Sequence, residues 1–353
     1  MFRDDPMLMP YRQVYRERCE FVARRRQEVL GGRSSLLEVA DWHQHYGMHR
    51  LEDGNWRFRE WLPWATRAVL LGQFNDWTAS PWFELHPLGN GDWEVDLPAT
   101  LMRHGQCYQL YVEWDGGSGW RLPSAVRAVK REKQPDGHVI FNAQIWEPET
   151  PYQWKHDDFT RPRWPLIYEA HVGLAQQEPR IGTFSEFTRR ILPRIAADGY
   201  DCVQLMAVAE HPYYASFGYH VSNFFAVTDL FGTPDDFKEL VDTAHGMGLC
   251  VIMDLVHSHA VKNELEGLGR LCGRQEQFFH SGPRGEHPAW NSYLFDYSKP
   301  QVARMLLSNC RFWLEEYHFD GFRFDGITSM LYFSHGLGKA FTSYDDYFGA
   351  DVD

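Results

Sequence analysis

The chain has 353 residues and a mass of 41.4 kDa, enough for about two or three domains of roughly 100–200 residues each. Hydrophobic residues make up 44% and charged residues 24%, a balance typical of globular proteins that excludes disorder along the whole chain. The 48 acidic and 35 basic residues give a net charge of −13, which argues against nucleic-acid and anionic-membrane partners, because both need clustered Lys and Arg.

The first residues, MFRDDPMLMPYRQVYRERCEF, contain neither the apolar run nor the cleavage site of a signal peptide. No stretch approaches the roughly 20 apolar residues that a membrane span needs. None of the six cysteines forms a C-x-x-C pair, so the sequence signals neither a zinc knuckle nor a thioredoxin-type motif. Cys202, Cys250 and Cys310 lie in apolar segments and are expected to be buried thiols. Such thiols fit a reducing compartment, and we expect a cytoplasmic protein.

Tryptophan usage divides the chain. Twelve of the 14 Trp precede residue 165, and a proline-rich polar stretch lies just before that point. We therefore expect an N-terminal helical segment over residues 1–37, a β-sandwich over 38–150, a linker over 151–165 and a β/α domain over 166–353.

The charged stretch 11–30 lacks helix breakers and predicts a solvated helix. Short β-rich runs separated by turn signals such as Asn90-Gly91-Asp92 follow it, a spacing typical of an antiparallel β-sandwich. The predicted strands are Trp56–Leu62, Ala68–Phe74, Asp92–Leu97, Cys107–Trp114 and His138–Trp146.

Beyond Pro165 the pattern alternates between strand and helix, which indicates a parallel sheet with helices outside it, open or closed. Thr233 followed by Pro234 predicts a capped helix start, and Ser298 predicts a second capping box that opens a helix ending near Tyr317. The remaining predicted elements are strands at Leu166–Gly173, Asp201–Val208, Leu249–Val256 and Gly321–Gly326, and a helix at Phe184–Ala197.

The last predicted strand reads GFRFDG. Because side chains alternate along a strand, Arg323 and Asp325 share one face. Polar inward residues at the C-terminal ends of barrel strands are typical of catalytic sites, and an adjacent Arg favours the ionised carboxylate that a nucleophile requires. The alternative is a purely structural Arg–Asp pair.

The strand before it runs LCVIMDLVHSHA and ends with Asp254, His257 and His259. A metal site is conceivable, but no further ligand lies at a metal-like spacing. The alternatives are a cluster that hydrogen-bonds a polar ligand and ordinary surface histidines. An aromatic loop containing Tyr219 and His220 precedes this strand, and it either contributes to a site or packs beneath a lid.

Together these motifs resemble the α-amylase superfamily, glycoside hydrolase family 13, and within it the branching enzymes. The resemblance is carried by YEAHVG (Tyr168–Gly173), ASFGYHVSNFF, the segment Asp254–His259, HSGPRG (His280–Gly285) and GFRFDGITSM. In the first half, Trp61-x-Pro63, GQFNDW (Gly72–Trp77) and GDWEV (Gly91–Val95) resemble a family 48 carbohydrate-binding module. The resemblance implies a (β/α)8 barrel after the sandwich.

The resemblance also implies roles. Asp325 matches the family's nucleophile and Arg323 the residue that keeps it ionised, while Asp254 and His259 shape the sugar site, Tyr219 stacks under the cleaved ring and His220 contacts sugar. The implied reaction cuts an α-1,4-glucan and transfers the chain to a 6-hydroxyl with retention. The partner is an α-glucan, without cofactor or metal. Trp61, Trp77 and Trp93 are candidate glucan platforms in the module, with a place in the sandwich core as their alternative.

Only four of the eight barrel strands are evident, and the family's acid/base Glu would lie on the next one. Glu169, Asp320, Asp345, Asp346 and Asp351 have no positional claim to that role. We therefore expect the sequence to be a fragment with little activity alone. Two other functions stay open: a hydrolase or debranching enzyme of the same superfamily, and a non-catalytic glucan-binding protein.

Overall fold

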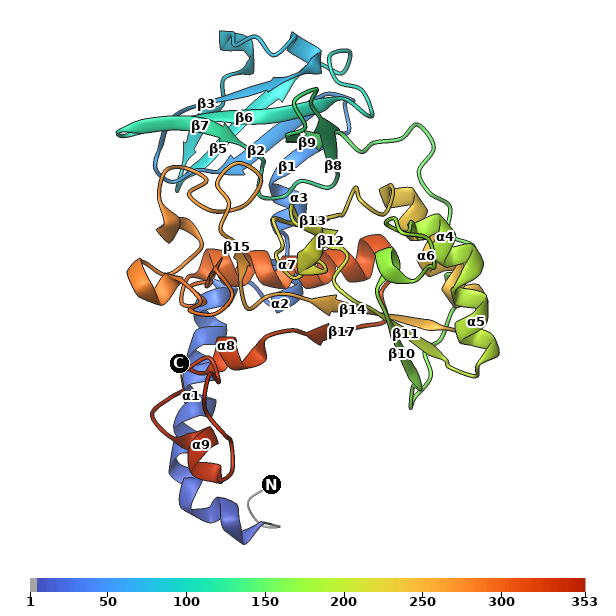
Figure 1. The fold of residues 1–353 in the computed structure, drawn as a ribbon. Helices are drawn as coiled ribbons and strands as arrows, with labels where there is room; N and C mark the ends of the chain where they lie inside the picture. Colours follow the sequence, from blue (N-terminus) through green and yellow to red (C-terminus); the bar gives the residue numbers. More distant parts are fainter. Residues whose placement is uncertain (1–4, 353) are drawn as a thin grey trace.

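The computed structural model describes residues 5–352. Residues 1–4 and Asp353, which the predicted first and last segments include, lie outside the described residues. Figure 1 shows three parts along the chain: a long N-terminal helix, a β-sandwich, and a parallel sheet with helices packed beside it. A sandwich followed by the first part of a β/α barrel is the predicted architecture, and it is confirmed.

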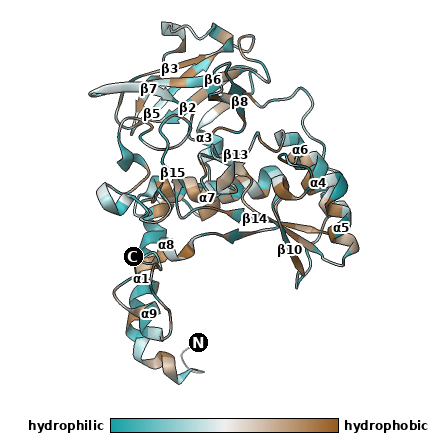
Figure 2. Ribbon diagram, viewed as in Figure 1, coloured by the Kyte–Doolittle hydropathy of each residue, from teal (hydrophilic) through white to brown (hydrophobic). Residues whose placement is uncertain are grey.

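The predicted N-terminal helix is present as α1 (Arg12–Leu30), after a 3-10 turn η1 (Pro6–Tyr11). It is mostly hydrophilic (Figure 2), and Leu30 is its only buried residue. It ends where Gly31 adopts a left-handed backbone with φ of 56°. Two short helices, α2 (Leu36–Val39) and α3 (Trp42–His45), then pack against a helix of the barrel.

The sandwich consists of two antiparallel sheets. One has the strand order β1-β2-β5-β4, and the other has the order β3-β6-β9-β8 with β7 paired to β6. Inward side chains of both sheets, among them Trp56, Phe58, Leu70 and Leu110, are fully or almost fully buried. The strand bounds are β1 Gly47–Arg50, β2 Trp56–Trp61, β3 Ala65–Gly72, β4 His86–Gly89, β5 Asp92–Leu97, β6 Cys107–Trp114, β7 Gly117–Arg121, β8 Val129–Lys133 and β9 Val139–Gln144.

All five predicted sandwich strands are confirmed, but four others, β1, β4, β7 and β8, were not predicted. Their residues are mainly exposed or half-buried, so they lack the alternating apolar pattern on which the prediction relied. Two 3-10 turns, η2 (Gln73–Asn75) and η3 (Pro81–Phe83), connect β3 to β4.

The barrel part is a four-stranded parallel sheet in the order β10-β11-β14-β17, as the alternating pattern predicted. Its strands are β10 Ile167–Ala170, β11 Cys202–Leu205, β14 Cys250–Leu255 and β17 Gly321–Phe324. Its helices are α4 Phe184–Arg190, α5 Leu192–Ala197, α6 Pro234–Gly246 and α7 Pro300–Tyr317. The predicted cap of α6 is present, since the Thr233 side chain accepts from the backbone N–H of Asp236.

One predicted cap is wrong. Helix α7 begins at Pro300 with Lys299 as its N-cap, and no side chain caps it. The Ser298 hydroxyl and backbone N–H both donate to Asp296 Oδ1, at 2.5 and 3.1 Å, and this local turn takes Ser298 away from the helix start.

Two excursions leave the parallel sheet at its carboxyl edge. The first contains the antiparallel pair β12 (Ala209–Glu210) and β13 (Asn223–Val227), and the second contains β15 (Ala260–Val261) and β16 (Ser292–Tyr293). The remaining short elements are η4 Val172–Leu174, η5 Tyr214–Ser216, η6 Gln275–Gln277, η7 Gly282–Gly285, α8 Ile327–Leu331 and α9 Tyr344–Phe348.

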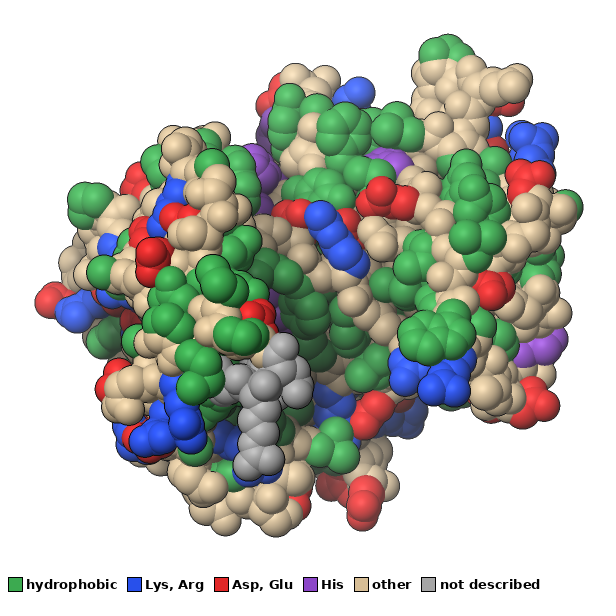
Figure 3. All heavy atoms as spheres, turned by 90° about the horizontal axis from the view of Figure 1, so that it is seen from below, with side chains coloured by type: hydrophobic (Ala, Val, Ile, Leu, Met, Phe, Trp, Pro, Cys, Tyr) green, Lys and Arg blue, Asp and Glu red, His purple; other side chains and the backbone are tan. Residues whose placement is uncertain are grey.

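The sheet presents an open face to solvent. Ile167, Tyr168 and Phe324 on its outer strands are 42%, 38% and 37% exposed. Figure 3 looks at the molecule from below, where hydrophobic side chains line a hollow. Segment 151–165 is not a detached linker, because the Tyr152 hydroxyl and the Lys155 and His156 backbone N–H groups all donate to the carboxylate of Asp242 on α6.

Candidate active site

Two acidic residues meet at the carboxyl edge of the parallel sheet. Asp254 lies near the end of β14, and Asp325 directly follows β17. The two strands pair in parallel with Asp254 opposite Arg323, so their ends reach the same edge. The structure thus brings Asp254, Arg323 and Asp325 together. Strand alternation predicted this for Arg323 and Asp325, and the family resemblance implied it for Asp254.

Arg323 joins the two carboxylates. Its Nη1 donates to Asp254 Oδ1 and Oδ2 at 2.8 and 2.9 Å and to Asp325 Oδ1 at 2.6 Å. Asp254 is fully buried, whereas the Asp325 side chain remains 23% exposed. Burial raises the pKa of Asp254, and the hydrogen bonds from Arg323 and Tyr219 oppose that rise. Asp325 is therefore the carboxylate of this pair that a ligand can reach.

Tyr219 and His259 complete the arrangement behind Asp325. The Tyr219 hydroxyl donates to Asp254 Oδ2 at 2.7 Å, and His259 Nε2 donates to the carbonyl oxygen of Tyr219 at 2.8 Å. Burial lowers the pKa of His259 to about 4, so its imidazole is neutral at physiological pH. The ring of His220 lies edge-on to that of His259, with centroids 6.2 Å apart.

A cavity of about 540 Å³ opens above these residues, large enough for sugar rings. Asp325, Tyr219, His220 and His259 line it, whereas Arg323 and Asp254 support it from behind. Its other lining residues are Tyr213, Ala215, Ser216, Ala289 and Trp290. The sequence prediction missed Trp290, whose only signal was its place as one of two Trp after residue 165.

Trp290 is held in place by stacking. Its ring is parallel to that of His287, with an interplanar angle of 5° and centroids 3.7 Å apart, and it lies 5.0 Å from the ring of His259. His287 Nε2 is within 3.0 Å of the hydroxyl of Ser329, four residues after Asp325. An ordered flat aromatic surface of this kind suits the apolar face of a sugar ring.

The conceivable metal site is not formed. His257 is buried, and its Nε2 bonds to Asn309 Oδ1 at 2.8 Å, whereas His259 and Asp254 bond to Tyr219. Within residues 5–352, no group of three His, Cys, Asp or Glu side chains converges as metal ligands would.

Two of the three candidate platforms in the sandwich are wrong. Trp61 and Trp93 are only 7% and 9% exposed and belong to the core. Their indole N–H groups donate to the backbone carbonyls of Asn90 and Leu62. Pairing of β2 with β5 places Trp93 on the sheet face that packs inside the sandwich and Trp61 on the opposite face. There the Trp61 ring packs edge-on against Trp42 and Phe278, with centroids 6.0 and 5.6 Å apart.

Trp77 does lie at the surface, and it has a partner. Trp77 and Trp120 are each 38% exposed, with ring centroids 6.2 Å apart, and both line a cavity of about 640 Å³. Gln109 and Asn142 add amide groups to the same cavity. The sequence prediction missed Trp120, because it lies in the unpredicted strand β7.

Known protein families match both the sandwich and the barrel part of the chain. Residues 45–127 match Carbohydrate-binding module 48 (Isoamylase N-terminal domain), and residues 192–267 match Alpha amylase, catalytic domain. Proteins named 1,4-alpha-glucan-branching enzyme from Dictyostelium discoideum, Yarrowia lipolytica and Equus caballus are 43%, 45% and 42% identical over 100%, 98% and 99% of this chain.

The chain spans about half the length of these relatives, namely 52%, 51% and 50%. Among solved structures, a putative alpha amylase from Salmonella typhimurium matches with a TM-score of 0.64 and 26% identity, over 81% of this chain and 44% of that one. A pullulanase from Bacillus acidopullulyticus has the same fold, with a TM-score of 0.67 and 20% identity, over 81% of this chain and 38% of that one.

Proposed function

Because this chain belongs to the α-amylase superfamily and is related to 1,4-alpha-glucan-branching enzymes along its whole length, we propose that it supplies the binding module and first half of the barrel of a glucan-branching enzyme. Such an enzyme cuts an α-1,4-glucan and transfers the chain to a 6-hydroxyl. The observation that carries the proposal is Asp325, which faces a sugar-sized cavity while Arg323 holds it.

In the proposed mechanism, Asp325 attacks the anomeric carbon while the C1–O4 glycosidic bond breaks, so a covalent glycosyl-enzyme forms. The departing glucan leaves with a free 4-hydroxyl, whose proton comes from an acid/base carboxyl. Arg323 donates to Asp325 Oδ1 at 2.6 Å and so fixes the orientation of the attacking carboxylate. Tyr219 and His220 line the cavity beside Asp325, where they contact the sugar ring. A 6-hydroxyl of a second glucan then replaces water as the acceptor, so the anomeric configuration is retained.

Retention also needs an acid/base carboxyl about 5–5.5 Å from the nucleophile. Asp254 shares Arg323 with Asp325, but it is fully buried and accepts from both Arg323 and Tyr219, so it is not placed to give a proton to a leaving group. Asp320 bonds to the Val251 backbone, and Glu169 accepts from Gln204. We propose that the acid/base lies outside the described residues.

The 353-residue chain alone is accordingly expected to branch amylose at least about 10²-fold more slowly than a complete enzyme, since general acid–base catalysis contributes about 10²–10⁴-fold. The comparison is a chimaera in which this chain continues into the unmatched second half of the Dictyostelium discoideum relative. NMR of the products counts α-1,6 linkages, and a reducing-sugar assay separates transfer from hydrolysis. Equal branching rates for the chain and the chimaera would show that the 353-residue chain already contains its acid/base. New reducing ends without α-1,6 linkages would favour a hydrolase.

For the module, we propose that Trp77 and Trp120 hold the α-glucan. Trp77→Ala and Trp120→Ala should each raise the Kd for glycogen about tenfold, a loss of about 1.4 kcal/mol, because each removes an exposed aromatic surface. Affinity electrophoresis of the 353-residue chain in glycogen gels measures this. Trp82→Ala is the matched control, since Trp82 is 83% exposed and does not line the cavity. Weakening by Trp82→Ala alone would reject the assignment.

We also propose a cytoplasmic location. All six cysteines are free thiols in the structure, as expected in a reducing compartment. Among the described residues, no helix has the length and apolar character to cross a membrane.

A further inference from the structure

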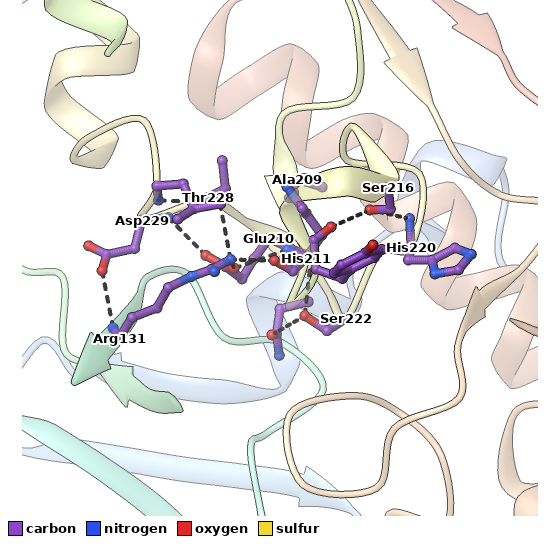
Figure 4. Close-up of polar contacts among 12 residues, drawn as sticks. Arg131, Ala209, Glu210, His211, Ser216, His220, Ser222, Thr228 and Asp229 are labelled. Atoms are coloured by element: carbon purple, nitrogen blue, oxygen red, sulfur yellow. Dashed lines mark hydrogen bonds and ion pairs between the residues drawn. The ribbon is translucent and has the colours of Figure 1, made fainter. Parts of the chain in front are cut away.

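One arginine of the binding module reaches into the barrel. Arg131 lies on β8 of the sandwich, and its Nη2 donates to Glu210 Oε1, to the His211 carbonyl oxygen and, at 3.5 Å, to Thr228 Oγ1 (Figure 4). These three acceptors lie at the two ends of the excursion that follows β11. The module therefore contacts the barrel at the base of a loop that leads into the candidate site.

Glu210 is the centre of this contact. It is fully buried, and it accepts from the backbone N–H of His211 at 3.0 Å through Oε1 and from that of Asp229 at 2.8 Å through Oε2. The Asp229 carboxylate in turn accepts from the Arg131 backbone N–H at 3.1 Å. Arg131 and Glu210 together thus fasten both strands at the base of the loop.

Residues 211–221 form the loop between β12 and β13, and hydrogen bonds between Ser222 and Glu210 close its base. The backbone N–H and hydroxyl of Ser222 donate to the Glu210 carbonyl at 2.9 and 3.2 Å. Of the residues that line the catalytic cavity, this loop supplies Tyr213, Ala215, Ser216, Tyr219 and His220. The position of its base therefore sets the position of more than half of the cavity lining.

Hydrogen bonds within loop 211–221 couple its base to the residues that line the cavity beside Asp325, so a shift of the base moves those residues as well. The Ser216 hydroxyl donates to the Tyr213 carbonyl at 2.7 Å and accepts from the His220 backbone N–H at 3.4 Å. Gly218 has φ of 89°, and a Cβ there would lie 2.1 Å from the Ala207 carbonyl oxygen, so the chain passes too close for any other residue.

We propose that Arg131 is a positioning residue: acting from the binding module through Glu210, it fixes the base of loop 211–221 and so places Tyr219 and His220 beside Asp325. Its guanidinium lies over the Phe141 ring at 4.8 Å and its side chain is only 13% exposed, so it is itself held firmly. The loop's role in sugar binding rests on the proposed function, whereas its dependence on Arg131 does not.

Lys130 offers a matched control. It is adjacent in sequence and also bridges to the barrel, with Nζ 3.1 Å from Asp229 Oδ1, but its side chain is 46% exposed. An exposed pair of this kind contributes little to stability. Lys130→Met removes a module-to-barrel cation without touching Glu210.

The test is hydrogen exchange of the 353-residue chain, read by mass spectrometry. Arg131→Met should speed exchange at least tenfold in peptides covering 211–222 and leave the peptides of β3 and β6 unchanged, and Lys130→Met should change neither. A merely stabilising role would instead raise exchange in all peptides together. That uniform result, or unchanged exchange in the loop, overturns the proposal.

Arg131→Met leaves a buried carboxylate without its cation, which can unfold the domain. The double variant R131M/E210Q removes both charges, and it should still show fast exchange in 211–222, because the His211 and Thr228 acceptors lose their donor. Protection at the wild-type level in this variant would overturn the proposal.

In the chimaera, the double variant should lower kcat/KM for amylose about tenfold at unchanged Tm. An inactive parent chimaera would count against the proposed function and leave the exchange result standing.

Discussion

Asp325→Asn is expected to lower the branching rate of the chimaera by about 10⁴-fold or more, a loss in the range seen when a nucleophile that acts with its partners is removed. The amide cannot attack the anomeric carbon, so no glycosyl-enzyme forms. NMR of α-1,6 linkages formed from amylose measures the rate. Binding should change much less, because Tyr219, His220 and Trp290 still line the cavity.

Glu315→Gln serves as the matched control for this change. Glu315 is a 49% exposed carboxylate on α7 whose partner is Arg311 one helical turn away, and its loss should leave the rate within about twofold, as surface changes usually do. A fall of less than about a hundredfold for Asp325→Asn would show that another group forms the covalent bond.

Arg323→Leu is expected to destabilise the chain by about 3 kcal/mol at pH 7, at the low end of the cost of breaking a buried pair. The low end applies because Arg323 itself is 45% exposed, although its partner Asp254 is fully buried. Burial already raises the pKa of Asp254, and removing the guanidinium raises it further. Urea unfolding monitored by tryptophan fluorescence measures the loss.

The pH dependence of the unfolding free energy tests the pair of Arg323 and Asp254 more sharply. A carboxyl whose folded-state pKa lies above its unfolded value destabilises the fold progressively as pH rises through that pKa. The gap in unfolding free energy between the wild type and Arg323→Leu should therefore widen from pH 4 to pH 8. Arg323→Lys keeps the charge and should recover part of the gap. A gap that does not change with pH would mean that Asp254 does not depend on Arg323 for its charge.

The sequence predicted the parts of the site that lie on regular strands. Alternation along GFRFDG placed Arg323 and Asp325 on one face, and parallel pairing aligned Arg323 with Asp254. The meeting of Tyr219 and His259 was implied only by family resemblance, because it depends on the path of loop 211–221 past Ala207, which no local periodicity encodes.

The wrong platform assignments have a similar cause. Trp61, Trp77 and Trp93 look alike in sequence, but strand pairing puts Trp93 inside the sandwich and Trp61 on the opposite face of the same sheet. There Trp42 and Phe278 cover Trp61, whereas Trp77 follows η2 and stays exposed. The contact between Arg131 and Glu210 joins residues 79 positions apart in two domains. Contacts of this range follow from domain packing, so a pattern-based interpretation of either segment alone does not predict them.

Covalent bond formation at Asp325 is the central step of the proposed reaction. A 5-fluoro glycosyl fluoride incubated with the chimaera tests this, because fluoride leaves without a proton from the acid/base and the ring fluorine slows release of the intermediate. Digestion and mass spectrometry should find the sugar on Asp325 within the segment GFRFDGITSM, and find none on Asp325→Asn. A branching-active chimaera that carries the label on another carboxylate, or none at all, would show that Asp325 is not the nucleophile.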